Sequence, residues 1–164
     1  MTHSADRKTT AEITTFDTSK IASVIITLNE VLADTYRLVL KSQIYHWNVT
    51  GPLFVTLHDL TEQQYTDMFT AVDVLAERIR ALGKPVMISA EILAAGPNGQ
   101  DADASLTADG MINDLLSDHE ALALRMRALV AAAEVADDPV TADLATARAG
   151  FHEKAAWMLR ATSA

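Results

Sequence analysis

The sequence predicts an all-α protein folded as a four-helix bundle with one long crossover. Its 164 residues are 49% hydrophobic and 21% charged, a composition typical of one globular domain. Apolar residues recur at helical spacing over four long stretches. The connection between the second and third stretches is long and the other two are short, an order that predicts a bundle with a single crossover.

The first predicted helix follows a segment without helical periodicity. Residues 1–16 mix polar and charged side chains, so we expect a flexible N-terminal tail before a bundle that spans 17–164. The helix is expected over about 19–48 and ends before the breakers Gly51 and Pro52. Its apolar face consists of Ile21, Val24, Ile25, Leu28, Leu32 and Val39.

The second predicted helix covers about 54–82 and leads into the crossover. Gly83 stands where a C-terminal glycine cap is expected, and Pro85 follows as a breaker. The segment 84–104 is long enough to cross the length of a bundle and leaves room for one short helix near 89–95. Its breakers are Pro85, Gly96, Pro97 and Gly99.

The third and fourth predicted helices form the second half of the bundle. The third is expected over about 105–135. Asp138 followed by Pro139 is a favourable N-cap and first-turn pair for the fourth, which should continue to about residue 161. Short, long and short connections of this kind match a ferritin-like four-helix bundle whose crossover carries a short helix.

Charge and composition limit the function. The formal net charge is −9 and the sequence pI is about 4.8, so the protein should attract cations and repel nucleic acid and anionic lipid. No apolar run approaches the roughly 18 residues that span a bilayer, and the first twenty residues lack the apolar stretch of a signal peptide, so we expect a cytoplasmic protein. Cysteine is absent, so a metal site would have to use His, Asp and Glu.

Metal-competent side chains share one stripe of the second helix. With His58 at zero, about 100° per residue puts Glu62 near 40°, Asp73 near 60° and Glu77 near 100°. His46 lies near the end of the preceding helix. However, Glu62 and Asp73 are separated by roughly 16 Å along the axis, whereas ligands that share an ion each lie roughly 2 Å from it. One chain therefore cannot close the site.

Two antiparallel copies of the second helix would close it. A two-fold axis near Asp67 would bring His58 and Glu62 of one chain opposite the acidic pair of the other and create two identical sites. The stripe between the donor pairs is apolar, as such a contact requires: Tyr65, Phe69, Val72 and Ala76.

Two imidazoles and three carboxylates without sulfur suit Fe(II), and the carboxylates can also hold Fe(III). Zinc and manganese fit the same donors. Any single pair could be solvated surface charge, but the joint spacing favours a metal centre.

The quoted residues resemble the Dps family, the miniature ferritins also called DNA-binding proteins from starved cells. The resemblance rests on a His-x11-His-x3-acid-x10-Asp-x3-Glu spacing formed by His46, His58, Glu62, Asp73 and Glu77. Further resemblance lies in the stretches 46–54 and 76–83 and in the last helix from His152 to Arg160.

The resemblance implies a dodecamer built from two-fold dimers, a hollow shell that stores ferric mineral. Its ferroxidase centres, holding one or two irons, would lie between subunits, with His46, His58 and Glu62 from one chain and Asp73 and Glu77 from its neighbour. Hydrogen peroxide is usually the preferred oxidant in this family, so protection from oxidative damage is expected. Relatives often have Asp at the position of Glu62.

Three further residues are assigned by the same resemblance. Trp47 would lie by the centre and intercept a stray oxidising equivalent, although a buried interface aromatic explains it about as well. Asp143 would line a three-fold pore with Asp138 near its mouth, although acids at a helix N-terminus are ordinary. Asp59 would face the cavity, or be a solvated surface acid.

The alternative function is that of a nucleoid-associated protein that condenses DNA. Several relatives bind DNA through lysine-rich tails that contact phosphates. Here Arg7, Lys8 and Lys20 are offset by Asp6, Glu12 and Asp17. We therefore expect no direct DNA binding.

Overall fold

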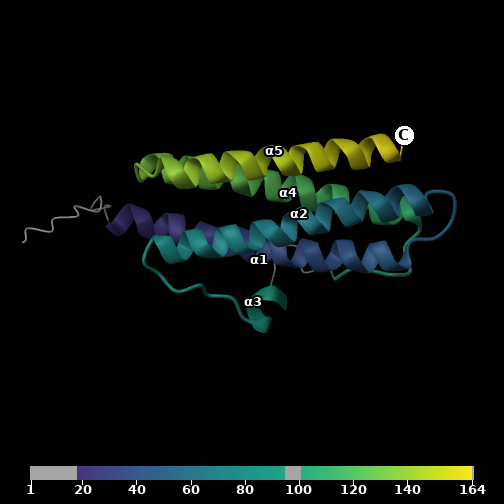
Figure 1. Ribbon diagram of the computed structural model, residues 1–164, viewed down its shortest axis with the longest axis horizontal. Coiled ribbons are helices and arrows are strands. Elements are labelled where there is room, and N and C mark those ends of the chain that lie inside the picture. Colours follow the sequence, from purple (N-terminus) through teal and green to yellow (C-terminus); the bar gives the residue numbers. More distant parts are fainter. Residues whose placement is uncertain (1–17, 95–100, 164) are drawn as a thin grey trace, which may run out of the picture.

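The computed structural model describes residues 18–94 and 101–163, and they form four long helices and one short one. The long helices are α1 (Thr18–Asn48), α2 (Phe54–Ala81), α4 (Ala108–Val135) and α5 (Pro139–Thr162). The short helix α3 (Ala90–Ala94) lies outside the bundle, on the side of α1 in Figure 1. The all-α four-helix prediction is confirmed. The predicted tail, on which the DNA-binding alternative depends, lies outside the described residues.

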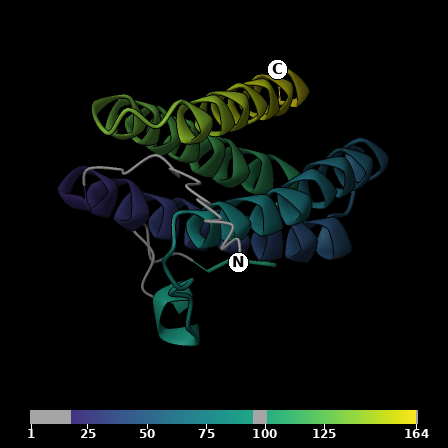
Figure 2. The ribbon, with the colours of Figure 1, turned by 60° about the vertical axis from the view of Figure 1, so that its left-hand side comes forward.

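The bundle consists of two hairpins laid against each other. Helices α1 and α2 form one hairpin and α4 and α5 the other, and α1 also packs along α4 (Figures 1 and 2). The chain before α4 lies at the end of α1, where the Asp103 N–H contacts the Tyr45 hydroxyl, and α4 runs antiparallel to α1. The core between the helices consists of large, fully buried side chains, among them Leu28, Leu32, Leu75, Leu115, Met126 and Leu129.

The helix ends follow from local chemistry. Gly83 has a φ of +81°, and the Lys84 N–H donates to the Ile79 carbonyl oxygen, which is the expected glycine cap. Helix α4 begins three residues later than predicted. The Thr107 side chain caps it by accepting from the Gly110 N–H, whereas Ser105 is held in a turn by hydrogen bonds to the Asp103 carboxylate.

No helix in the described part of the chain is long and apolar enough to cross a membrane.

Candidate metal centre

His46 and His58 lie against each other at one end of the α1–α2 hairpin. His46 is in the last turn of α1 and His58 in the second turn of α2, and the short connection between them turns at Gly51, which has a φ of +88°. A residue other than glycine is strained at that φ. The two imidazole rings stack with their centroids 3.7 Å apart and an interplanar angle of 17°.

Crossed hydrogen bonds fix the orientation of both rings. His46 Nδ1 lies 2.9 Å from the His58 carbonyl oxygen, and His58 Nδ1 lies 2.9 Å from the His46 carbonyl oxygen. A carbonyl oxygen can only accept, so each Nδ1 carries a proton, and in the neutral ring Nε2 keeps its lone pair. This is the tautomer in which imidazole binds a metal through Nε2 while Nδ1 donates to an orienting group.

Aromatic rings and a threonine surround the two imidazoles. Tyr65 meets the His46 ring edge-on at 5.4 Å, and Phe54 lies 5.1 Å from the His58 ring. The Thr61 hydroxyl donates to the His58 carbonyl oxygen at 3.0 Å, the same oxygen that receives His46 Nδ1–H. His46 is buried and His58 is half-buried, so the pair is shielded on most sides.

The predicted carboxylates are not gathered around this pair within one chain. Glu62, Asp73 and Glu77 are all exposed, and none of them forms an ion pair with another described residue. The described residues contain no group of three or more side chains able to hold a metal ion. A single chain thus offers an imidazole pair at one end of the stripe and an acidic pair further along the same helix.

The stripe between the two donor groups is apolar and partly open. Phe69 is 59% exposed, and Tyr65, Val72 and Ala76 are half-buried. Exposed apolar residues in a contiguous stripe are typical of an interaction surface.

Trp47 is 64% exposed in the single chain. It is adjacent to His46 in sequence, but the aromatic rings that pack on the stacked imidazoles are those of Tyr65 and Phe54.

The two predicted pore residues have different environments. Asp138 is buried, caps the N-terminus of α5 through the Thr141 N–H, and accepts from Arg78 Nη2 at 2.6 Å. These contacts favour the alternative stated above, an acid at a helix N-terminus. Asp143 is exposed on α5. Asp59 is also exposed and lines a groove with Glu62 along α2, on the side of α5.

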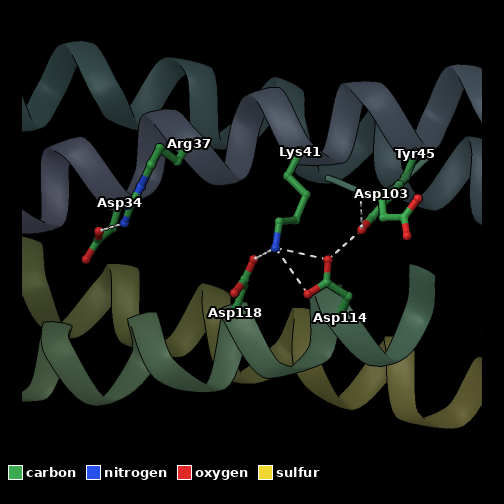
Figure 3. Close-up of polar contacts among 7 residues, drawn as sticks. All are labelled: Asp34, Arg37, Lys41, Tyr45, Asp103, Asp114 and Asp118. Atoms are coloured by element: carbon green, nitrogen blue, oxygen red, sulfur yellow. Dashed lines mark hydrogen bonds and ion pairs between the residues drawn. The ribbon is translucent and has the colours of Figure 1, made fainter. Parts of the chain in front are cut away.

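A buried ion-pair network next to His46 was not predicted. Lys41 Nζ lies 2.7 Å from Asp118 and 3.0 Å from Asp114, and the Tyr45 hydroxyl donates to Asp114 at 2.5 Å (Figure 3). The Asp103 N–H donates to the same hydroxyl oxygen, which ties the end of the crossover to α1. Burial and the contact with Asp114 raise the pKa of Tyr45. The network stabilises the last turns of α1, from which His46 projects.

A sequence signal for this network exists. Lys41 and Tyr45 are four residues apart, as are Asp114 and Asp118, so each pair occupies one helix face. Antiparallel packing of α1 on α4 then brings the two faces together.

The sequence is similar to one protein family and to individual members of it. The model of the ferritin-like domain family matches residues 25–163. DNA protection during starvation protein 2 of Bacillus anthracis is 40% identical over 139 residues, which cover 84% of this chain and 94% of that protein.

Solved structures of Dps proteins have the same fold as this chain. Dps from Thermosynechococcus elongatus has a TM-score of 0.83 at 33% identity and covers 90% of this chain and 94% of its own. A Dps protein from Vibrio cholerae, described as a member of a superfamily of ferritin-like diiron-carboxylate proteins, has a TM-score of 0.81 at 30% identity, covering 88% of this chain and 91% of its own.

Proposed function

Because this chain belongs to the Dps family of ferritin-like proteins, we propose that it oxidises ferrous iron at centres shared between two subunits and stores the ferric product. His46, His58 and Glu62 of one subunit and Asp73 and Glu77 of its neighbour are the proposed iron ligands. Iron is the substrate, and hydrogen peroxide is the proposed oxidant.

The crossed hydrogen bonds between His46 and His58 carry this proposal. They consume both Nδ1 atoms and leave both Nε2 lone pairs for a metal. Neutral imidazoles with nearby carboxylates suit Fe(II), and the carboxylates keep affinity for Fe(III). The net charge of −9 favours cation binding over anion binding.

The apolar stripe on α2 provides the contact that completes the centre. Two copies of α2 placed antiparallel about Asp67 bury Phe69, which is exposed in the single chain, and cover its half-buried neighbours. The same arrangement places the acidic pair of one subunit opposite the imidazole pair of the other. Each dimer then holds two identical centres.

The proposed reaction consumes ferrous iron and hydrogen peroxide together, the two reagents that would otherwise form hydroxyl radical. Two ferrous ions each give one electron to one peroxide molecule, the O–O bond breaks, and two protons from solvent complete two water molecules. A two-electron reduction of this kind releases no hydroxyl radical. The product Fe(III) passes into a proposed twelve-subunit shell, with Asp143 at the proposed entry pore and Asp59 on its inner surface.

Co-expression of two inactive variants tests the shared centre. His58→Ala and Glu77→Ala should each lower peroxide-dependent ferrous oxidation at least about 10-fold, because each removes a ligand from every centre. Mixed at random, half of the dimers combine one of each, and one of their two centres regains all its ligands. We therefore expect about a quarter of wild-type activity. The measurement is ferric absorbance after anaerobic loading with ferrous ion and addition of peroxide.

A matched mixture separates shared from internal centres. Wild type co-expressed with the double variant His58→Ala/Glu77→Ala should also retain about a quarter of the activity if ligands come from two chains. Centres inside single chains would give no recovery in the first mixture and about half of wild-type activity in the second. That pair of results, or a wild-type protein that does not oxidise iron, would exclude the proposal.

A further inference from the structure

Two buried histidines have no part in the proposed metal centre. His119 on α4 and His152 on α5 are both 0% exposed, and their Nδ1 atoms lie 2.9 Å apart. A hydrogen bond at this position needs one donor and one acceptor. One Nδ1 therefore carries a proton and the other accepts it. With both rings neutral, the accepting ring carries its own proton on Nε2.

In the described part of the chain, neither Nε2 atom of the pair has a hydrogen-bond partner that would stabilise a charged ring. Several buried side-chain atoms in the described part of the chain lack a hydrogen-bond partner: Ser42 Oγ, both polar atoms of Gln64, Arg148 Nε and Nη2, and the Nε2 atoms of His119 and His152. The antiparallel contacts of Arg78 with Thr141 and of Asp67 with Arg148 fix the register of α2 on α5. That register places Gln64 level with His152.

Arg148 is the charged side chain that acts on both histidines. On α5, Arg148 keeps one guanidinium edge buried while its Nη1 donates to Asp67 of α2 at 2.6 Å. On α1, Lys41 is bound to Asp118, the residue before His119. Burial and the charge of Arg148 lower the pKa of His119 to about 3, and burial and the charges of His119 and Arg148 lower the pKa of His152 well below 6.5.

We propose that the His119–His152 pair is an acid-sensitive latch between α4 and α5. At neutral pH the hydrogen bond between the two Nδ1 atoms joins the two helices inside the core. An additional proton on the accepting Nδ1 removes the only accepting lone pair of this contact and makes that ring an imidazolium next to Arg148. Uptake of one more proton by the other ring then gives two adjacent cations. The helices then separate locally so that both imidazolium rings reach water. This latch does not depend on the proposed iron chemistry.

The direction of the pH dependence follows from the two states. In the open state each ring recovers its ordinary pKa of 6.5, whereas in the closed state its pKa is lower. The closed state is therefore fully favoured above pH 6.5 and loses stability as pH falls below that value. Each proton taken up on opening contributes up to about 10-fold per pH unit, so the opening equilibrium should change by up to about 100-fold per pH unit.

Hydrogen–deuterium exchange of the assembled full chain measures this opening. Between pH 8 and 4.5, and after correction for intrinsic exchange rates, amides of α4 and α5 near the pair should lose protection steeply below pH 6.5. The double variant His119→Leu/His152→Leu should show a flat dependence. Leu122→Ala, which removes a buried side chain of α4 without a titrating group, should lower protection at every pH and keep the wild-type slope.

A measurement on the wild-type protein covers the case in which the double variant does not fold. Exchange of the imidazole C2 hydrogens, followed by mass spectrometry, reports the titration of each histidine. Both residues should titrate at least about one pH unit below the same residues in denatured protein. Titration near 6.5 in the folded protein would overturn the latch. So would a wild-type slope in a folded double variant, or a zinc-dependent protection lost in that variant, which would identify a metal site instead.

Discussion

At the scale of single residues, Asp138 joins two helices, α2 and α5, through three contacts of one carboxylate. It caps α5 through the Thr141 N–H, accepts from the Thr141 hydroxyl, and pairs with Arg78 of α2. Asp138 is 1% exposed, so water replaces none of these contacts easily. The residue therefore connects the two hairpins of the bundle at the start of α5.

We expect Asp138→Ala to lower the free energy of unfolding by about 3 kcal/mol, because it removes a helix cap and leaves the Arg78 guanidinium without its partner. For a chain of this size the loss corresponds to a fall of roughly 6–12 °C in the midpoint of thermal unfolding. Circular dichroism during heating measures it. Asp138→Asn keeps an oxygen for the cap and should lose less. An alanine variant with wild-type melting would contradict this account.

The same carboxylate has a defined pH dependence. Burial alone would raise the pKa of Asp138, but the hydrogen bonds from Arg78 and Thr141 and the charge of Arg78 lower it below 3.8. Its contribution to stability is present above pH 3.8 and is lost as pH falls through the lowered pKa. The latch histidines lose their contribution from pH 6.5 downward, so the two effects occupy different pH ranges.

Residue patterns indicated which side chains could act as metal donors, but not how those side chains are oriented. The spacing of His46 and His58 indicated a ligand pair, and Asp138 was recognised as an N-cap candidate. The crossed hydrogen bonds could not be predicted, because they depend on how Gly51 turns the connection between two helices. The contact between His119 and His152 could not be predicted, because the sequence does not show which residue of another helix a histidine will meet.

At the scale of helices, the two hairpins end their first helices in different ways. After α2 the cap residue with positive φ is Gly83, whereas after α4 it is Asp137, with a φ of 54°. The Asp138 N–H still donates to the Ala133 carbonyl oxygen, so the cap hydrogen bond forms. A residue with a side chain is strained at this φ, although Asp tolerates it better than most.

We expect Asp137→Gly to raise the free energy of unfolding by about 1 kcal/mol, because glycine adopts positive φ without steric cost. The charge itself should matter little, since Asp137 lies between the C-terminus of α4 and the N-terminus of α5, where helix dipoles act in opposite senses. Thermal unfolding should shift up by roughly 2–4 °C.

The control is the reverse change at the equivalent position. Gly83→Ala should destabilise by about 1 kcal/mol, and because an added Cβ there meets nothing within 4 Å, the loss would come from backbone conformation alone. Equal stability of wild type and Asp137→Gly would show that the cap is not strained.

Helix boundaries were predictable where the breaker was in the sequence. Gly83 and Asp138 mark ends that the structure confirms within one residue. The start of α4 was predicted too early because Ser105 continues the polar pattern before the helix. Its hydrogen bonds to Asp103 favour a turn instead, and only the Thr107 cap begins the helix.

At the scale of the molecule, a bundle that buries its core well still leaves the apolar stripe of α2 partly exposed, with Phe69 as its most open side chain. The periodicity of that helix predicted both the buried face and the stripe, since each repeats every three to four residues. Neither the sequence nor the structure of a single chain, however, shows how two chains contact each other. The proposed centre therefore depends on a two-fold axis between two chains, whereas the fold of each chain can be argued from its own sequence and packing.

We expect Phe69→Glu to dissociate the assembly while each chain stays folded. The side chain is 59% exposed in the single chain, so its loss there costs little, whereas two glutamates facing each other near the two-fold axis would repel and stay hydrated. Sedimentation velocity should show smaller species with unchanged helical circular dichroism. Thr70→Glu, one residue on and about 100° round the helix, should assemble as wild type does.

Loss of assembly should also abolish iron oxidation, although every proposed ligand remains in the chain. Dissociation leaves an imidazole pair and an acidic pair at separate places on α2, each with too few donors for one ion. A dissociated Phe69→Glu variant that still oxidised ferrous iron at the wild-type rate would show that one chain suffices. A variant that assembled normally would instead remove the stripe from the subunit contact.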